Sequence, residues 1–156
     1  MSFSFNEENL NAYQQMLPRY PHKKALLLPC LWMGQYQEGY LSKEVMLYLT
    51  ELLDLPLAHI YAVASFYTMF NLEAVPTFHI QVCKTLSCEL CGKNDIIKAI
   101  KEETGLKVGE ENEQFKLTEV ECLGACGGAP MLAMNEEYHE NLTPTKVKEL
   151  LQRLAK

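Results

Sequence analysis

Cysteine is the residue whose spacing in this chain carries chemistry, because five of the six cysteines fall in two short clusters. They read Cys-x4-Cys-x2-Cys and then, after thirty residues, Cys-x3-Cys: Cys83, Cys88, Cys91, Cys122 and Cys126. Thiolates are soft ligands, and several of them on short loops favour an iron–sulfur cluster or zinc. Structural zinc sites usually have x2 spacings in both halves, so the spacing here favours iron–sulfur.

Two sets of four ligands are compatible with this spacing. The first set is Cys83, Cys88, Cys91 and Cys122, which fits the plant-type ferredoxin pattern. The second set is Cys83, Cys88, Cys122 and Cys126, two sulfurs from each cluster. We favour the second set because it leaves no thiol without a partner in the Leu-Gly-Ala-Cys-Gly-Gly loop, and Cys91 is then a neighbour of the site.

Two predicted strands lead directly into the two clusters. Residues 78–82 alternate apolar and polar side chains before Cys83, and residues 115–120 form a second strand before Cys122. Adjacent strand ends bring distant loops to one edge of a sheet, so the two clusters are expected to share one site. Both loops contain glycines, which let the backbone approach a ligand and adopt positive φ; these are Gly92, Gly124, Gly127 and Gly128.

The remaining elements complete a small sheet with helices. Residues 94–104 have a helical pattern that ends at Gly105. Residues 131–134 and 138–142 are expected to pair as strands, and Thr143 is placed to cap a last helix. The predicted order after residue 76 is therefore βαβββα.

The first seventy residues are predicted to be helical. Candidate helices cover residues 7–17, 23–38 and 43–53, and a fourth carries Ile60, Val63 and Ala64. Pro29 predicts a kink or break, and Cys30 is expected to be a small core residue. We therefore expect an α+β chain, with a helical bundle domain over residues 1–73 and a sheet domain over residues 76–156.

Composition excludes several other classes of protein. Lys and Arg number 14 against 20 for Asp and Glu, a net charge of −6, which argues against a nucleic-acid partner. No apolar run is long enough to span a bilayer, so no direct membrane insertion is expected. The N-terminus resembles neither a signal nor a transit peptide, which favours a cytoplasmic location. No Ser–His–Asp or paired-carboxylate arrangement is present, so we expect no catalytic residue.

The cysteine segments CKTLSCELCG and VECLGACGGAP resemble the thioredoxin-like [2Fe-2S] ferredoxins, in particular the NuoE-type subunit of NADH:quinone oxidoreductase (respiratory complex I). The upstream run LDLPLAHIYAVASFYTMF is similar to the helical stretch of that family. The resemblance covers about residues 7–154. It implies a thioredoxin-like fold for residues 76–156 and one [2Fe-2S] cluster, held by Cys83, Cys88, Cys122 and Cys126.

The resemblance also implies a function and a partner. The expected role is single-electron exchange with the FMN of a flavin subunit (NuoF-type), which binds NADH, in a complex peripheral to the cytoplasmic side of the inner membrane. Alternatives are the equivalent subunit of an NAD-dependent formate dehydrogenase or an NADH-linked hydrogenase, a free-standing ferredoxin, and a zinc-stabilised adaptor. A free ferredoxin has no need of a helical arm of about seventy residues, which favours a subunit.

Overall fold

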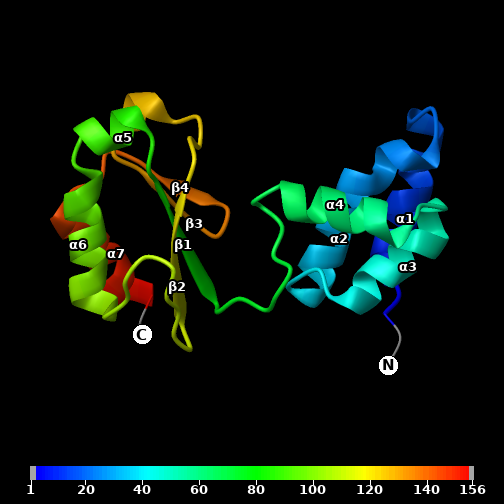
Figure 1. The fold of residues 1–156 in the computed structure, drawn as a ribbon, viewed down its shortest axis with the longest axis horizontal. Coiled ribbons are helices and arrows are strands. Elements are labelled where there is room, and N and C mark those ends of the chain that lie inside the picture. Colours follow the sequence, from blue (N-terminus) through cyan, green and yellow to red (C-terminus); the bar gives the residue numbers. More distant parts are fainter. Residues whose placement is uncertain (1–2, 155–156) are drawn as a thin grey trace. The chain divides into compact units, whose positions relative to one another are not determined.

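The computed structural model describes residues 3–154 of the chain. Its contacts divide it into two compact units, Met1–Ala74 and Val75–Lys156. The first unit is helical and the second combines helices with a sheet (Figure 1). The predicted α+β class is therefore confirmed.

Within the described residues, the first unit contains four α-helices and two 3-10 turns. In chain order they are α1 (Glu7–Met16), η1 (Leu17–Arg19), η2 (Lys23–Leu26), α2 (Leu27–Glu38), α3 (Lys43–Leu53) and α4 (Leu57–Phe66). Ser42 caps α3 as predicted, since its Oγ accepts the Val45 N–H at 3.2 Å. Pro29 causes no kink inside a helix: it lies in the first turn of α2, where proline is tolerated, and the expected break is the change from η2 to α2.

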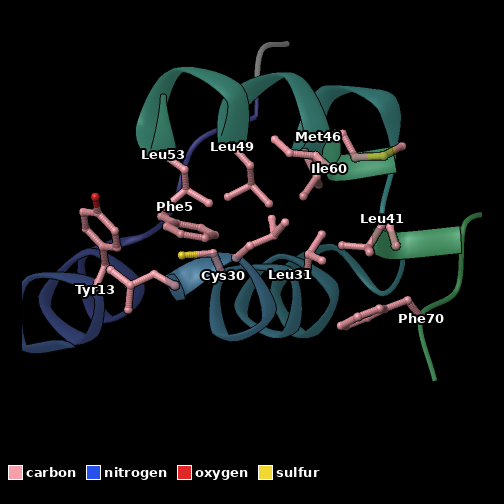
Figure 2. Packing of buried hydrophobic residues seen from close by; sticks show 14 residues of the cluster. Phe5, Tyr13, Cys30, Leu31, Leu41, Met46, Leu49, Leu53, Ile60 and Phe70 are labelled. Atoms are coloured by element: carbon pink, nitrogen blue, oxygen red, sulfur yellow. The ribbon is translucent and has the colours of Figure 1, made fainter. Parts of the chain in front are cut away.

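Cys30 lies in the core of the helical unit. Its side chain is fully buried, and Figure 2 shows its sulfur pointing into the cluster beside Phe5. Leu49 and Ile60 belong to the same cluster. Burial raises the pKa of the Cys30 thiol to about 12, so this cysteine stays protonated and packs as an apolar residue, as expected.

The second unit is a four-stranded sheet with helices. Its elements are β1 (Phe78–Cys83), α5 (Leu86–Leu90), α6 (Lys93–Thr104), β2 (Phe115–Val120), η3 (Cys126–Gly128), β3 (Leu132–Met134), β4 (Glu137–His139) and α7 (Pro144–Leu154). The strand order is β2-β1-β3-β4; β1 and β2 are parallel, and β3 is antiparallel to β1 and β4. The predicted βαβββα order is confirmed, with the five-residue helix α5 as an addition.

Helices α6 and α7 pack against each other and cover one face of this sheet (Figure 1). The apolar core between them includes Ile80, Leu117, Ile100, Val147 and Leu151, each at most 2% exposed. The strands that lead into the cysteine loops are therefore packed against a continuous apolar core. No helix in residues 3–154 has the length and apolar character that crossing a membrane requires.

The strand register brings the two cysteine loops together. Cys83 pairs with Val120 across the parallel strands β1 and β2, so both strands end at the same edge of the sheet. Strand β3 starts from that edge, where the Cys83 N–H donates to the Met131 carbonyl at 3.4 Å. In Figure 1, α5 and the yellow-orange coil of η3 lie at this one end of the sheet.

The last strand is shorter than predicted. Strand β4 ends at His139, whereas the sequence pattern predicted residues 138–142. Beyond β4 the chain still follows the second cysteine loop, because the Asn141 N–H donates to the Gly128 carbonyl at 2.6 Å and the Leu142 N–H to the Pro130 carbonyl at 3.0 Å. Asn141 has a φ of 50°, which is incompatible with a continuous strand.

Candidate metal centre

The five clustered cysteines lie on both loops at the end of the sheet. Cys83 is the last residue of β1, Cys88 lies in α5 and Cys91 follows the end of α5, whereas Cys122 and Cys126 belong to the loop after β2. Cys83 and Cys88 are buried, at 2% and 1% exposure, and the other three are exposed. The site therefore has a buried inner half and an outer half open to solvent.

The sulfur atoms form two pairs, one from each loop. The Sγ atoms of Cys122 and Cys126 are 3.6 Å apart. Cys83 and Cys88 lie in one buried cluster with Met131, and Cys83 and Cys126 both raise the pKa of Cys88. In residues 3–154 no three histidine, cysteine or carboxylate side chains converge as ligands of a single ion. Two pairs of thiols on separate loops would suit the four thiolate ligands of a binuclear iron–sulfur cluster.

Cys91 lies at the end of α5, and its side chain is exposed. Cys122 and Cys126 are exposed as well. Exposure therefore does not separate the two predicted ligand sets, and the choice between them stays a prediction.

Hydrogen bonds prepare two of the thiols for deprotonation. Burial raises the pKa of Cys83, but hydrogen bonds from Thr85, Cys88 and the Leu123 backbone outweigh it and leave this pKa lowered. Hydrogen bonds from the Gly124 backbone, the Cys126 thiol and the Thr85 hydroxyl lower the pKa of Cys122. Thiolates are the form that binds iron, so these donors favour metal binding.

The pKa of Cys88 is shifted in the opposite direction. Burial raises its pKa to about 11, and its hydrogen bond with Cys83 acts in the same direction, while the Met131 backbone opposes the shift. A metal ion must therefore displace the Cys88 proton, which couples metal loading to proton release.

Glycines shape both loops, as the sequence indicated. Gly92 and Gly124 have φ angles of 100° and 82°, a region that residues with a Cβ rarely adopt. The Gly124 N–H donates to the Cys122 sulfur at 3.4 Å. Gly128 serves a different purpose: a Cβ there would lie 2.7 Å from the Cβ of Glu140, so only glycine allows this close approach.

An ion pair ties the two loops together at their bases. Lys84, directly after Cys83, pairs with Glu121, directly before Cys122, at 2.9 Å. This pair was not predicted from the sequence. The adjacent positions of Lys84 and Glu121 at the two strand ends were the available signal, since the two strand ends were already expected to lie side by side.

The chemistry of the site fits an iron–sulfur cluster. It offers four thiols, backbone N–H donors, and apolar walls formed by Leu123, Ala125, Ala129 and Met131. Donors and burial of this kind set the potential of an anionic cluster. The four histidines are not part of it.

Comparisons with known proteins agree with this chemistry. The family model described as thioredoxin-like [2Fe-2S] ferredoxin matches residues 13–155. The chain is 41% identical to the E subunit of the NADH-quinone oxidoreductase of Rickettsia bellii, over 98% of this chain and 95% of the relative. The corresponding protein of Rickettsia conorii is 40% identical, with the same coverage of both chains.

Solved structures share the fold. A crystal structure of an NAD+-reducing [NiFe]-hydrogenase in the air-oxidized state matches with a TM-score of 0.70 and 17% identity. The match covers 81% of this chain and 22% of the hydrogenase chain, so this chain spans about a fifth of that longer one. At this identity the likeness concerns the fold alone. The family match over almost the whole sequence, and relatives at about 40% identity, establish that the chain belongs to the thioredoxin-like [2Fe-2S] ferredoxin family.

Proposed function

We propose that this protein is the electron-transfer subunit of an NADH:quinone oxidoreductase and carries one [2Fe-2S] cluster. The observation that carries the proposal is two pairs of cysteines on loops at one edge of the sheet, in a chain 41% identical to a subunit of such a complex. The cluster exchanges single electrons with the FMN of a partner subunit that oxidises NADH. The protein breaks and forms no substrate bond, so it has no catalytic residue of its own.

Four cysteines hold the cluster in this proposal. Cys83 and Cys88, which share one buried cluster, would hold one iron, and Cys122 and Cys126, whose sulfurs lie 3.6 Å apart, would hold the other. Such a cluster supplies one-electron transfer when it is bound. The chain's part is to hold four thiolates, donate backbone N–H groups to them, and limit the access of water to the buried pair.

The two cysteine pairs differ in burial, so one side of the site is more accessible to a partner than the other. Cys122 and Cys126 are exposed, whereas Cys83 and Cys88 lie beneath them against Met131. Electron transfer needs a short path between redox groups, and the outer pair offers the shorter path to a partner. We therefore place the flavin subunit over the Cys122–Cys126 loop.

The helical unit and the location follow from the same proposal. A shuttle ferredoxin needs only the sheet unit, so the four helices of residues 1–74 serve as an attachment to the flavin subunit, which holds FMN and the NADH site. The complex is peripheral to the membrane, on its cytoplasmic side. The division into a helical domain over residues 1–73 and a cluster domain over residues 76–156 belongs to this proposal.

The likeness to a hydrogenase supports a second candidate, an equivalent subunit in an NADH-linked hydrogenase. That likeness rests on the fold at 17% identity, whereas the likeness to the Rickettsia bellii protein reaches 41% over nearly both full chains. The quinone-linked complex is therefore the better supported host.

Metal and sulfide analysis of anaerobically purified protein tests the cofactor. We expect about two irons and two acid-labile sulfides per chain, with a rhombic one-electron EPR signal after reduction. Zinc without sulfide would refute electron transfer and leave a structural protein. Co-purification from the native host then tests the partner: we expect a flavoprotein that oxidises NADH, and a hydrogenase in its place would favour the second candidate.

A further inference from the structure

Thr85 lies in the first cysteine loop, and its hydroxyl contacts a cysteine sulfur. Its Oγ1 is 3.3 Å from the Cys83 sulfur. The same hydroxyl helps to lower the pKa of Cys122, which belongs to the other loop. The measured contact of the Thr85 side chain is with the Cys83 sulfur.

Thr85 uses its hydroxyl for this contact and leaves the start of helix α5 without a side-chain cap. It is the N-cap residue of α5, with the extended backbone that an N-cap requires, yet its side chain makes no capping hydrogen bond. Asn6, Ser42 and Thr143 occupy comparable positions before α1, α3 and α7, and each accepts a backbone N–H with its side chain. An N-cap hydrogen bond is worth about 1 kcal/mol. The exception at Thr85 indicates that its hydroxyl has another role.

The direction of this hydrogen bond follows from the chemistry of the ligand. Between a thiol and a hydroxyl, either group can donate. A cysteine that binds iron is a thiolate, which has no proton and can only accept. In the loaded protein the Thr85 hydroxyl must therefore be the donor and a ligand sulfur the acceptor.

We propose that Thr85 is a positioning residue that donates a hydrogen bond to the Cys83 sulfur and thereby raises the reduction potential of the cluster. The inference rests on the proposed function, because it requires Cys83 to be a ligand. Reduction adds one negative charge to a cluster that is already anionic, and a donor at the sulfur stabilises the more negative state more strongly.

Three substitutions separate this role from a structural one. Thr85→Val removes the hydroxyl and keeps the shape, and it sacrifices no capping bond. Thr85→Ser restores the donor. Thr118→Val is the matched control, because the Thr118 hydroxyl lies in strand β2 and contacts His79, 2.8 Å away, in place of a sulfur.

An EPR-monitored redox titration of the full-length, cluster-loaded proteins measures the effect. At a fixed ambient potential, the ratio of reduced to oxidised cluster should fall about tenfold in Thr85→Val, equivalent to about 59 mV for a one-electron couple. Thr85→Ser and Thr118→Val should stay within threefold of the wild type. Pulsed EPR after exchange into D2O should show one deuteron coupling fewer in Thr85→Val than in wild type and Thr85→Ser, while the coupling from backbone donors such as the Gly124 N–H remains.

The outcomes distinguish this inference from the proposed function. Wild-type protein without iron and sulfide refutes the proposed function itself. Intact clusters in all variants, with less than a threefold change in Thr85→Val, overturn the tuning role alone. Thr85→Ala is the second variant should Thr85→Val hold no cluster. If neither binds a cluster, the hydroxyl is needed for assembly, and the tuning role is likewise overturned.

Discussion

The ammonium group of Lys93 lies 2.9 Å from the carboxylate of Glu119 and joins the start of α6 to strand β2. Lys93 also contacts Glu89 of α5 at 2.7 Å. The Lys93 side chain is 12% exposed, whereas its partners Glu89 and Glu119 are 44% and 27% exposed, so solvent screens this ion pair in part. The hydrogen bonds with Glu89 and Glu119 raise the pKa of Lys93, which stays charged. The contact fixes the first cysteine loop to the strand that leads into the second.

Replacing Lys93 should loosen the loop. Lys93→Met keeps the aliphatic stem but leaves two carboxylates without their cation. Because solvent screens the ion pair, we expect a loss of only about 1 kcal/mol in the free energy of unfolding. Thermal unfolding followed by circular dichroism measures it. Lys98→Met is the control, since Lys98 is exposed on α6 and makes no ion pair within 4 Å in residues 3–154. Equal melting temperatures for the two variants would show that the ion pairs of Lys93 with Glu89 and Glu119 do not stabilise the protein.

Two neighbouring glycines should respond differently to the same substitution. Gly128→Ala places a Cβ against Glu140, whereas a Cβ at Gly127 meets no atom within 4 Å. Overpacking of this kind costs about 1–3 kcal/mol, and the Cys126 loop must move to relieve it. We expect Gly128→Ala to lose iron and sulfide, while Gly127→Ala keeps both. Full cluster content in Gly128→Ala would mean that the Glu140 contact does not hold the loop.

His79 should make the stability of the sheet unit depend on pH. Burial and the positive charge of Lys116 lower its pKa from 6.5 to about 4, although Glu111 opposes the shift. The unfolded chain therefore binds a proton between pH 6.5 and 4 that the folded chain does not. The stability linked to His79 is fully present above pH 6.5 and is lost as the pH falls toward 4.

His79→Gln should remove this part of the pH dependence. We expect the melting temperature of the wild type to fall more between pH 7 and pH 5 than that of His79→Gln. Carboxylates change the stability of both proteins equally over this pH range, so their effect cancels in the comparison. His22→Gln, at an exposed position, is the control and should follow the wild type. Parallel curves for His79→Gln and wild type would show that His79 does not titrate differently on folding.

Local sequence signals predicted most of the fold because they act within a few residues. Ser42 before α3 and Gly105 after α6 mark helix ends whose capping depends on neighbours three or four residues away. The alternation before Cys83 and Cys122 predicted β1 and β2, and both strands end at one edge of the sheet as expected. Helix α5 was missed because five residues are too few for a helical period, although Thr85 and the i, i+4 pair Leu86 and Leu90 were signals for it.

Long-range contacts at the site were beyond the reach of the sequence pattern. The pairing of Lys93 with Glu119 joins residues 26 positions apart, and it depends on how α6 meets β2. The close approach of Glu140 to Gly128 arises because the chain after β4 returns along the second loop. The role of the Thr85 hydroxyl is likewise visible only once the two loops face each other.

Comparison of single cysteine variants tests the central claim most directly. Serine at Cys83, Cys88, Cys122 or Cys126 should abolish or distort the visible and EPR spectra of the reduced [2Fe-2S] cluster, because each replaces a ligand. Cys91→Ser should keep the wild-type spectra and the two irons per chain. A normal EPR signal in Cys126→Ser, together with its loss in Cys91→Ser, would contradict the proposed ligand set and place Cys91 on the cluster.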